Sequence, residues 1–274
     1  MTSPFGLVQF SIVLKYLHIT KMAFLRAAFY RFELLFDALK AIVMVIVFTQ
    51  IWQAIYTGRD VLAGFDLSQV IVYTCAAVTL SMLFEVNIER NIGWKVRTGD
   101  FAVEFIKPVN YFFLCFFESL GIALYTLIFA ALPTVLTLYL LFDLSGIVMA
   151  RLFAVLPMII LGFLLYYLAC HLAAMTTFWN EDVWGIVYLR TTLLRFFAGG
   201  FIPLSFFPDA LAEVNNYLPF KYMIYLPASA LAGKIPESSI GEIMAMQLFW
   251  CAVLLLVDQL FWGYVVRKVT VHGG

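Results

Sequence analysis

The chain has 274 residues, of which 64% are hydrophobic and only 12% are charged, whereas a soluble domain carries about 25% charged residues. A water-soluble fold could not bury that much apolar surface, so the composition excludes an ordinary soluble protein and predicts an all-α polytopic membrane protein. The formal net charge is zero, so nothing in the overall charge indicates a nucleic-acid partner, and we expect none.

The first 33 residues are predicted to form an interfacial helix that lies on the membrane. Lys15, His18, Lys21 and Arg26 fall within an arc of about 140° when a helix is assumed. The basic groups can meet lipid phosphates while the apolar face sinks into the bilayer. The alternative is an irregular lead-in to the first span.

Six apolar runs follow, and each is a predicted membrane span. A span needs about 20 residues. The third run has 32 residues, so it must tilt, protrude or bend, and Pro133 is the expected place for a bend or an end. We therefore expect one transmembrane domain over residues 1–274. The runs are Ala38–Tyr56, Leu67–Phe84, Tyr111–Phe142, Ile147–Met175, Tyr188–Phe207 and Ile243–Val266.

The distribution of Lys and Arg in the loops predicts the orientation, because basic residues are retained on the cytoplasmic side. Eleven lie in the N-terminal arm, in the loop after the second run and in the tail, against four in the remaining loops. Both termini are therefore expected in the cytoplasm.

The loop over residues 85–110 is the most charged part of the chain. Asp100 can cap a helix that continues through Glu104 and Phe105. Phe101, Phe105 and Ile106, standing among charges, favour a docking surface held at the membrane. The alternative is a solvated, charged turn.

The segment over residues 199–242 stays apolar although glycines and prolines interrupt it. Irregular backbone at membrane depth is tolerated only where it is packed in protein or lines a cavity. We expect short re-entrant half-helices in the outer leaflet instead of a straight span, whereas an ordinary surface loop would suit Asp209–Asn216. The interrupting residues are Gly199, Gly200, Pro203, Pro208, Pro219 and Pro227.

Three charged residues lie well inside predicted spans, namely Glu118, Arg195 and Asp258. A charge at mid-bilayer requires a partner or water. Counting along the helices places all three at one depth, so we expect Arg195 to form a salt bridge with Glu118 or Asp258. Alternatively, one of them faces a translocation path and contacts substrate, or the charges snorkel to the interface. Arg190, nearer the cytoplasmic edge, is expected to snorkel.

Catalytic and nucleotide-binding signatures are missing from the sequence. There is no HExxH, G-x-S-x-G or C-x-x-C motif and no Walker A loop. We expect no catalytic, metal-binding or cofactor-binding residues in this chain, so it is not expected to be an enzyme. If it performs ATP-driven work, another chain binds the ATP.

Two sequence patterns resemble the permease subunits of ABC transporters of the type-2 exporter family. The first is R-T-G-D followed by I-K-P-V, within Arg97–Val109. The second is G-G-F-I-P-L-x-F-F-P over Gly199–Pro208, followed by Leu218-Pro219-Phe220. The order of elements is similar over nearly the whole chain.

The resemblance implies a function and partners. In that family an interfacial helix precedes six spans, and the loop after the second span is a coupling helix that docks on a separate ATPase. ATP and Mg²⁺ would be bound by an ATPase dimer, and a second permease, identical or related, would complete the path in the plasma or inner membrane. The cargo stays open. The coupling role would fall on Arg97, Gly99, Asp100, Phe101, Glu104 and Phe105.

Two other classes remain possible from the residues alone. A secondary transporter or channel could use the intramembrane charges for proton coupling. A membrane-embedded enzyme could bring Glu118, Asp258 and His171 together, although a nucleophile or metal is missing.

Overall fold

The computed structural model describes residues 4–86, 88–107, 109–142, 148–179 and 183–268. Helices make up nearly all of this part, which confirms the all-α polytopic fold. The α-helices are α1 (Pro4–Ala27), α2 (Arg31–Ile55), α3 (Leu67–Leu83), α4 (Ile88–Thr98), α5 (Phe101–Ile106), α6 (Tyr111–Thr126), α7 (Leu132–Phe142), α8 (Val148–Met175), α9 (Val183–Phe197), α10 (Asp209–Asn216), α11 (Tyr225–Leu231) and α12 (Ile240–Lys268).

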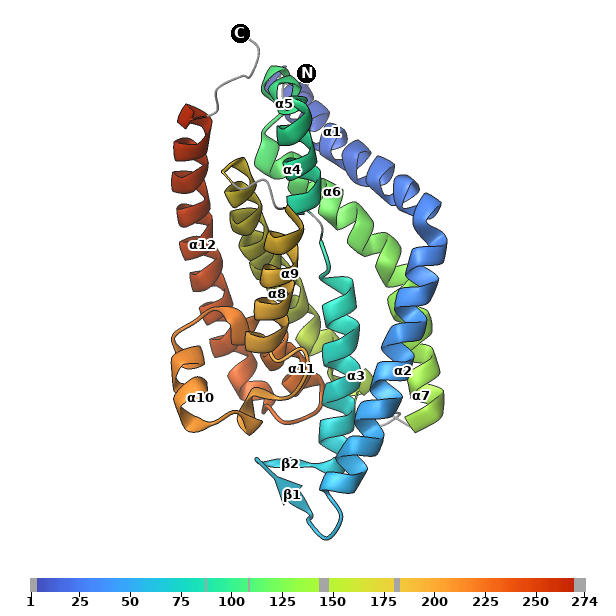
Figure 1. Ribbon diagram of the computed structural model, residues 1–274. Coiled ribbons are helices and arrows are strands. Elements are labelled where there is room, and N and C mark those ends of the chain that lie inside the picture. The colour runs from blue at the N-terminus through green and yellow to red at the C-terminus, as the bar shows by residue number, and fades with distance from the viewer. Residues whose placement is uncertain (1–3, 87, 108, 143–147, 180–182, 269–274) are drawn as a thin grey trace.

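The long helices run side by side between two ends of the molecule (Figure 1). A short antiparallel hairpin, β1 (Val61–Leu62) and β2 (Phe65–Asp66), marks one end, and α4 and α5 lie at the other, next to the start of α1 and the end of α12. The hairpin leads directly into α3, whose first turn is closed by a capping box between Asp66 and Gln69.

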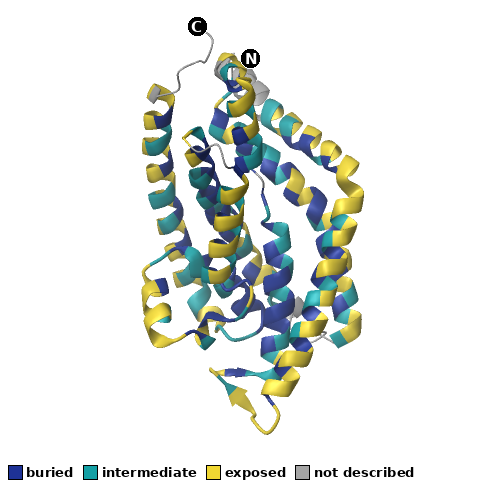
Figure 2. Ribbon diagram, in the orientation of Figure 1, coloured by how far each residue is buried: buried dark blue, intermediate teal, exposed yellow. Residues whose placement is uncertain are grey.

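Five helical stretches within the described residues are long and apolar enough to cross a membrane. Exposed residues follow the outer faces of α1, α2 and α12 (Figure 2), and many of them are large and apolar, such as Phe32, Phe36 and Leu260. Soluble proteins rarely expose such continuous apolar faces, so these faces suit lipid. The stretches are Leu14–Ile55, Leu67–Thr98, Tyr111–Phe142, Arg151–Phe178 and Glu237–Arg267.

The predicted fifth span, Tyr188–Phe207, is wrong in its boundaries. The helix in this region, α9, has 15 residues and ends at Phe197. Gly199 follows with a φ of +78°, a backbone conformation that glycine adopts without steric cost, and Pro203 precedes a 3₁₀ turn, Leu204–Phe206. The glycines and prolines therefore end this helix early, at about 22 Å for a 1.5 Å rise per residue.

Short helices replace a straight span between Gly199 and the start of α12. All residues of α11 from Pro227 onward are buried, and α11 packs against α3 and α8. A Cβ atom on Gly162 of α8 would lie 2.6 Å from the carbonyl oxygen of Met223, so glycine permits this close approach. The irregular backbone is thus packed in protein, and its depth in the membrane stays a prediction.

The third span bends next to the expected proline. A π-helical turn, Leu127–Ala131, joins α6 to α7, and the N–H of Leu132 donates to the carbonyl oxygen of Leu127, five residues back. Pro133 has no N–H to donate, and one extra residue in the preceding turn shifts the hydrogen-bond register before the proline. Single π-turns of this kind kink helices.

Helix α1 continues into α2 through a 3₁₀ turn, Ala28–Tyr30, and packs along α6. The hydroxyl of Thr20 donates to the carbonyl oxygen of Phe117 at 3.1 Å. A Cβ atom on Gly121 would lie 2.4 Å from the carbonyl oxygen of Thr20, so the two helices touch backbone to backbone at this point. The position of α1 on the membrane surface stays a prediction.

Replacing Gly121 by leucine should separate α1 from α6 and lower the melting temperature by several degrees, because a side chain has no room at the crossing. The measurement is thermal unfolding of the purified protein. Gly263→Leu in α12 is the matched control, since a Cβ atom there meets nothing within 4 Å. Equal melting temperatures for the two variants would contradict the close crossing.

Candidate functional site

The loop predicted as a coupling element forms a corner of two helices, α4 and α5. Gly99 joins them with a φ of +79°, and a Cβ atom there would meet nothing within 4 Å. The positive φ alone therefore favours glycine here, because no neighbouring atom restricts the size of the side chain. Helix α4 also continues the second span, because the chain leaves α3 at Leu83 and becomes helical again at Ile88.

Phe101 holds α5 against the bundle. Its ring lies 5.1 Å from Tyr111, 4.8 Å from Phe178 and 6.3 Å from Trp262, measured between centroids and all edge to face. The prediction that Phe101 belongs to a docking surface is wrong, because its side chain is buried among these rings. The side chain of Phe105 lies outside the described part of the structure.

Glu104 is also an internal residue. Its side chain is 5% exposed and forms ion pairs at 2.9 Å with Lys95 of α4 and with Lys107. Burial alone would raise the pKa of this carboxyl group, but the hydrogen bonds and charges of Lys107 and Lys95 outweigh burial and lower it. The ion pairs therefore stabilise the corner at neutral pH and lose that effect only as the pH falls through this lowered value.

Asp100 does not cap α5 as predicted. Its side chain makes no capping hydrogen bond and instead accepts one from the hydroxyl of Thr98 at 2.7 Å. Asp100, Arg97 and Gly99 are exposed, as expected for a contact surface. We call the exposed residues of this corner the tip, and they are Trp94, Arg97, Thr98, Gly99, Asp100, Val103 and Ile106.

A buried ion pair fixes α4 to α9. Nε of Arg190 donates to Glu89 at 2.6 Å, and the two side chains are 5% and 0% exposed. Arg190 also donates to the carbonyl oxygen of Val86, between α3 and α4, and to the hydroxyl of Tyr166. The prediction that Arg190 snorkels is therefore wrong.

The three intramembrane charges do not form one cluster. Arg195 pairs with Glu85 at 2.9 Å, at the break after α3. Glu118 pairs with Arg26 of α1 at 3.0 Å. Asp258 lies 2.6 Å from Nδ1 of His171, and both side chains are buried. The predicted pairing of Arg195 with Glu118 or Asp258 is wrong.

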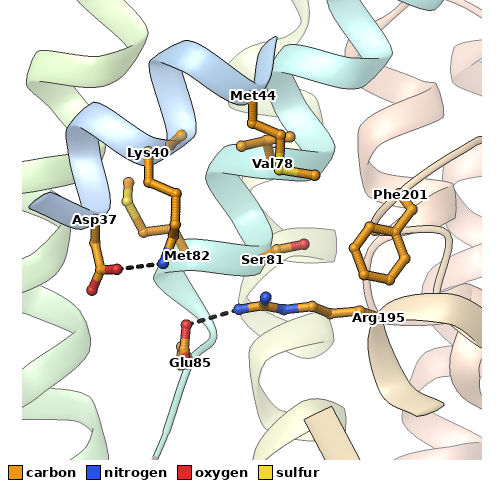
Figure 3. A pocket seen from close by; sticks show the side chains of 11 residues that line it. Asp37, Lys40, Met44, Val78, Ser81, Met82, Glu85, Arg195 and Phe201 are labelled. Atoms are coloured by element: carbon orange, nitrogen blue, oxygen red, sulfur yellow. Dashed lines mark hydrogen bonds and ion pairs between the residues drawn. The ribbon is translucent and has the colours of Figure 1, made fainter. Parts of the chain in front are cut away.

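A small cavity of about 40 Å³, lined by both charged and apolar residues, adjoins the pair of Arg195 and Glu85. Figure 3 shows Arg195 and Glu85 on one side of it, with Asp37 and Lys40 of α2 forming a second pair nearby. The buried hydroxyl of Ser81 and Nε of Arg195 have no protein partner among the described residues. The cavity is large enough for water, which can satisfy such groups.

Little in the sequence indicates the pair between Glu89 and Arg190. Glu89 stands in a charged stretch that suggested solvent, and Arg190 stands near the start of an apolar run. Their contact depends on how α4 packs against α8 and α9. A hydrophobic pattern within one helix contains no information about that packing.

The comparisons with known proteins agree with this architecture. No curated protein matches the chain. The sequence profile of the family described as "ABC-2 family transporter protein" matches residues 40–273, which is most of the chain. The matched residues include the corner of α4 and α5 and the short helices that follow Gly199. The chain therefore belongs to the ABC-2 transporter family and is a multi-pass membrane protein with the role of a transport permease.

Proposed function

We propose that this protein is the permease subunit of an ATP-driven exporter, and that a separate ATPase acts on the tip of the corner between α4 and α5. The ATPase dimer would bind ATP and Mg²⁺, and a second permease would complete the translocation path. Membership of the ABC-2 family supports partnership with an ABC ATPase in general. The direction of transport rests on the resemblance to exporters.

The observation that carries the proposal is the contrast between the interior and the surface of the corner. Phe101 and Glu104 are buried and fix the corner to the bundle, whereas Trp94 and Ile106 are 66% and 80% exposed. An exposed tryptophan and isoleucine beside charges of both signs suit a protein partner, because aromatic anchors supply affinity and charges supply register.

The corner is connected to the spans by rigid contacts. The pair of Glu89 and Arg190 joins α4 to α9, and the ring cluster of Phe101 joins α5 to α6 and α12. The chain is not helical at Glu85 and Val86, so α4 can turn relative to α3 without breaking a continuous helix. A push on the tip would therefore move α9, α6 and α12.

The charge distribution supports a cytoplasmic position for the tip and both termini. Lys95 and Arg97 lie in the last turn of α4, at the end of the molecule where α1 also begins (Figure 1). Basic residues are enriched on the cytoplasmic side of membrane proteins. With the protein in the plasma or inner membrane, an ATPase in the cytoplasm would thus meet the tip directly.

A second candidate is proton-coupled secondary transport. The buried pair of His171 and Asp258 favours it, because Nε2 of His171 and the second oxygen of Asp258 have no partner among the described residues. Intramembrane pairs of this type occur in proton relays. Such a transporter would work without an ATPase.

Purification of the tagged chain in mild detergent distinguishes the two candidates. We expect an ATPase to co-purify and to hydrolyse ATP. The double variant Trp94→Ser/Ile106→Ser should recover much less of this ATPase. Val214→Ser/Tyr217→Ser, in α10 and directly after it, is the matched control, since both residues are exposed and α10 lies away from the corner. Absence of any ATPase, or equal recovery with both double variants, would refute the proposal.

A further inference from the structure

A cavity of about 340 Å³ lies between α3, α6, α7 and α8 and has the most apolar lining of the described cavities. Its walls are almost entirely hydrocarbon. Thr79 is one of the few polar residues in the wall, and its hydroxyl already donates to the carbonyl oxygen of Cys75. Water needs two to four polar partners to stay in a cavity, so this cavity offers water no stable site.

The mouth of the cavity opens to the outer surface of the bundle. Leu124, Leu132, Leu156 and Ile160, from α6, α7 and α8, line it and are themselves exposed. These helices belong to stretches long and apolar enough to cross a membrane, so we expect lipid tails outside the mouth. The deep wall is different, because no residue of α3 between positions 70 and 83 is exposed.

The size of the cavity suits a long hydrocarbon chain. An engineered apolar cavity of about 150 Å³ stays dry and binds benzene, which has six carbon atoms. This cavity is a little more than twice as large, which corresponds by proportion to roughly 14 carbon atoms. If the cavity were empty, the side chains of its walls would lack packing contacts on one side.

The π-helical turn Leu127–Ala131 contributes to this space. Leu127 and Ala131 both line the cavity, together with Leu132 at the start of α7. The turn bends the third span at the level of the mouth, so α7 does not continue along the axis of α6. Isolated π-turns are frequent at functional sites.

We propose that this cavity is a binding site for one acyl chain of a bilayer lipid, which enters between α6, α7 and α8 and contacts α3. The chain completes the packing of the bundle. The assignment does not depend on coupling to an ATPase, so its test and the test of the proposed function can fail separately.

The test uses the full chain reconstituted in phosphatidylcholine vesicles that contain a small fraction of phosphatidylcholine with a diazirine near the end of one acyl chain. After irradiation, mass spectrometry should find cross-links on the α3 peptide, at Ala76, Thr79 or Leu83. Ala76→Phe should reduce labelling of α3 severalfold, while labelling of Leu256 on the exposed face of α12 stays unchanged.

Ala252→Phe, on an exposed position of α12, is the matched control and should leave labelling of α3 unchanged. Wild-type protein without labelling on α3 overturns the proposal, whether the cavity is empty or filled by a second copy of the chain. Equal α3 labelling in wild type and in a folded Ala76→Phe variant also overturns it. If Ala76→Phe fails to fold, the wild-type cross-links on α3 alone decide the outcome.

Discussion

Arg190→Leu is expected to destabilise the protein by about 3–5 kcal/mol, because it leaves the buried carboxylate of Glu89 without its partner. The change also removes the donor to the carbonyl oxygen of Val86 at the break after α3. The measurement is thermal or denaturant unfolding of the purified protein. We expect the double variant Glu89→Leu/Arg190→Leu to recover part of the loss, since it leaves no buried charge behind.

Lys40→Leu serves as the control for removing an ion pair. The pair of Lys40 and Asp37 is largely exposed, and exposed pairs contribute about 0–1 kcal/mol. If Arg190→Leu cost no more than Lys40→Leu, the buried pair would not be the connection between α4 and α9 that we describe.

Phe101→Ala is expected to cost about 3–5 kcal/mol, the range for truncating a buried phenylalanine. The loss should be concentrated at α5, because the ring cluster with Tyr111 and Phe178 is what holds this short helix. Hydrogen exchange should therefore rise at α5 and α4 more than elsewhere. ATPase stimulation should fall as well, although every residue of the tip is unchanged.

Phe29→Ala is the matched control, since Phe29 is 85% exposed at the turn between α1 and α2. We expect little change in unfolding or in ATPase activity from it. Normal ATPase stimulation in a folded Phe101→Ala variant would show that the tip works without a rigid attachment to the bundle.

The apolar runs of the sequence located most of the helices. The run Leu67–Phe84 became α3, and Ile243–Val266 lies within α12, because a stretch of about 20 apolar residues has few other stable solutions. The glycines and prolines after residue 198 correctly indicated short helices. They also ended α9 at Phe197, ten residues before the predicted boundary.

The partners of the charged residues could not be found in the same way. The predicted depths assume straight, continuous helices, but the second span breaks after Leu83 and brings Glu85 to Arg195. Likewise, α1 packs on α6 and brings Arg26 to Glu118. Such pairs depend on how each helix is rotated and on which helices pack beside it. The spacing of residues along one helix predicts neither the rotation nor the neighbouring helices.

The corner of α4 and α5 shows the same limit on a smaller scale. Phe101, Glu104 and Asp100 stand within five positions, and the sequence alone assigned all three to one surface. The structure buries Phe101 and Glu104 and exposes Asp100. A six-residue helix is too short for its periodicity to show which side faces the bundle.

The most direct test of the central claim is ATP hydrolysis by the complete transporter, reconstituted in liposomes, with Arg97→Glu/Asp100→Lys at the tip. Both residues are exposed, so we expect the melting temperature and membrane insertion to stay close to wild type. Glu213→Lys, a charge reversal on exposed α10, is the control and should retain activity. We predict that the tip variant loses permease-dependent ATP hydrolysis and transport. Wild-type hydrolysis and transport by the tip variant would contradict the claim that an ATPase acts through this corner.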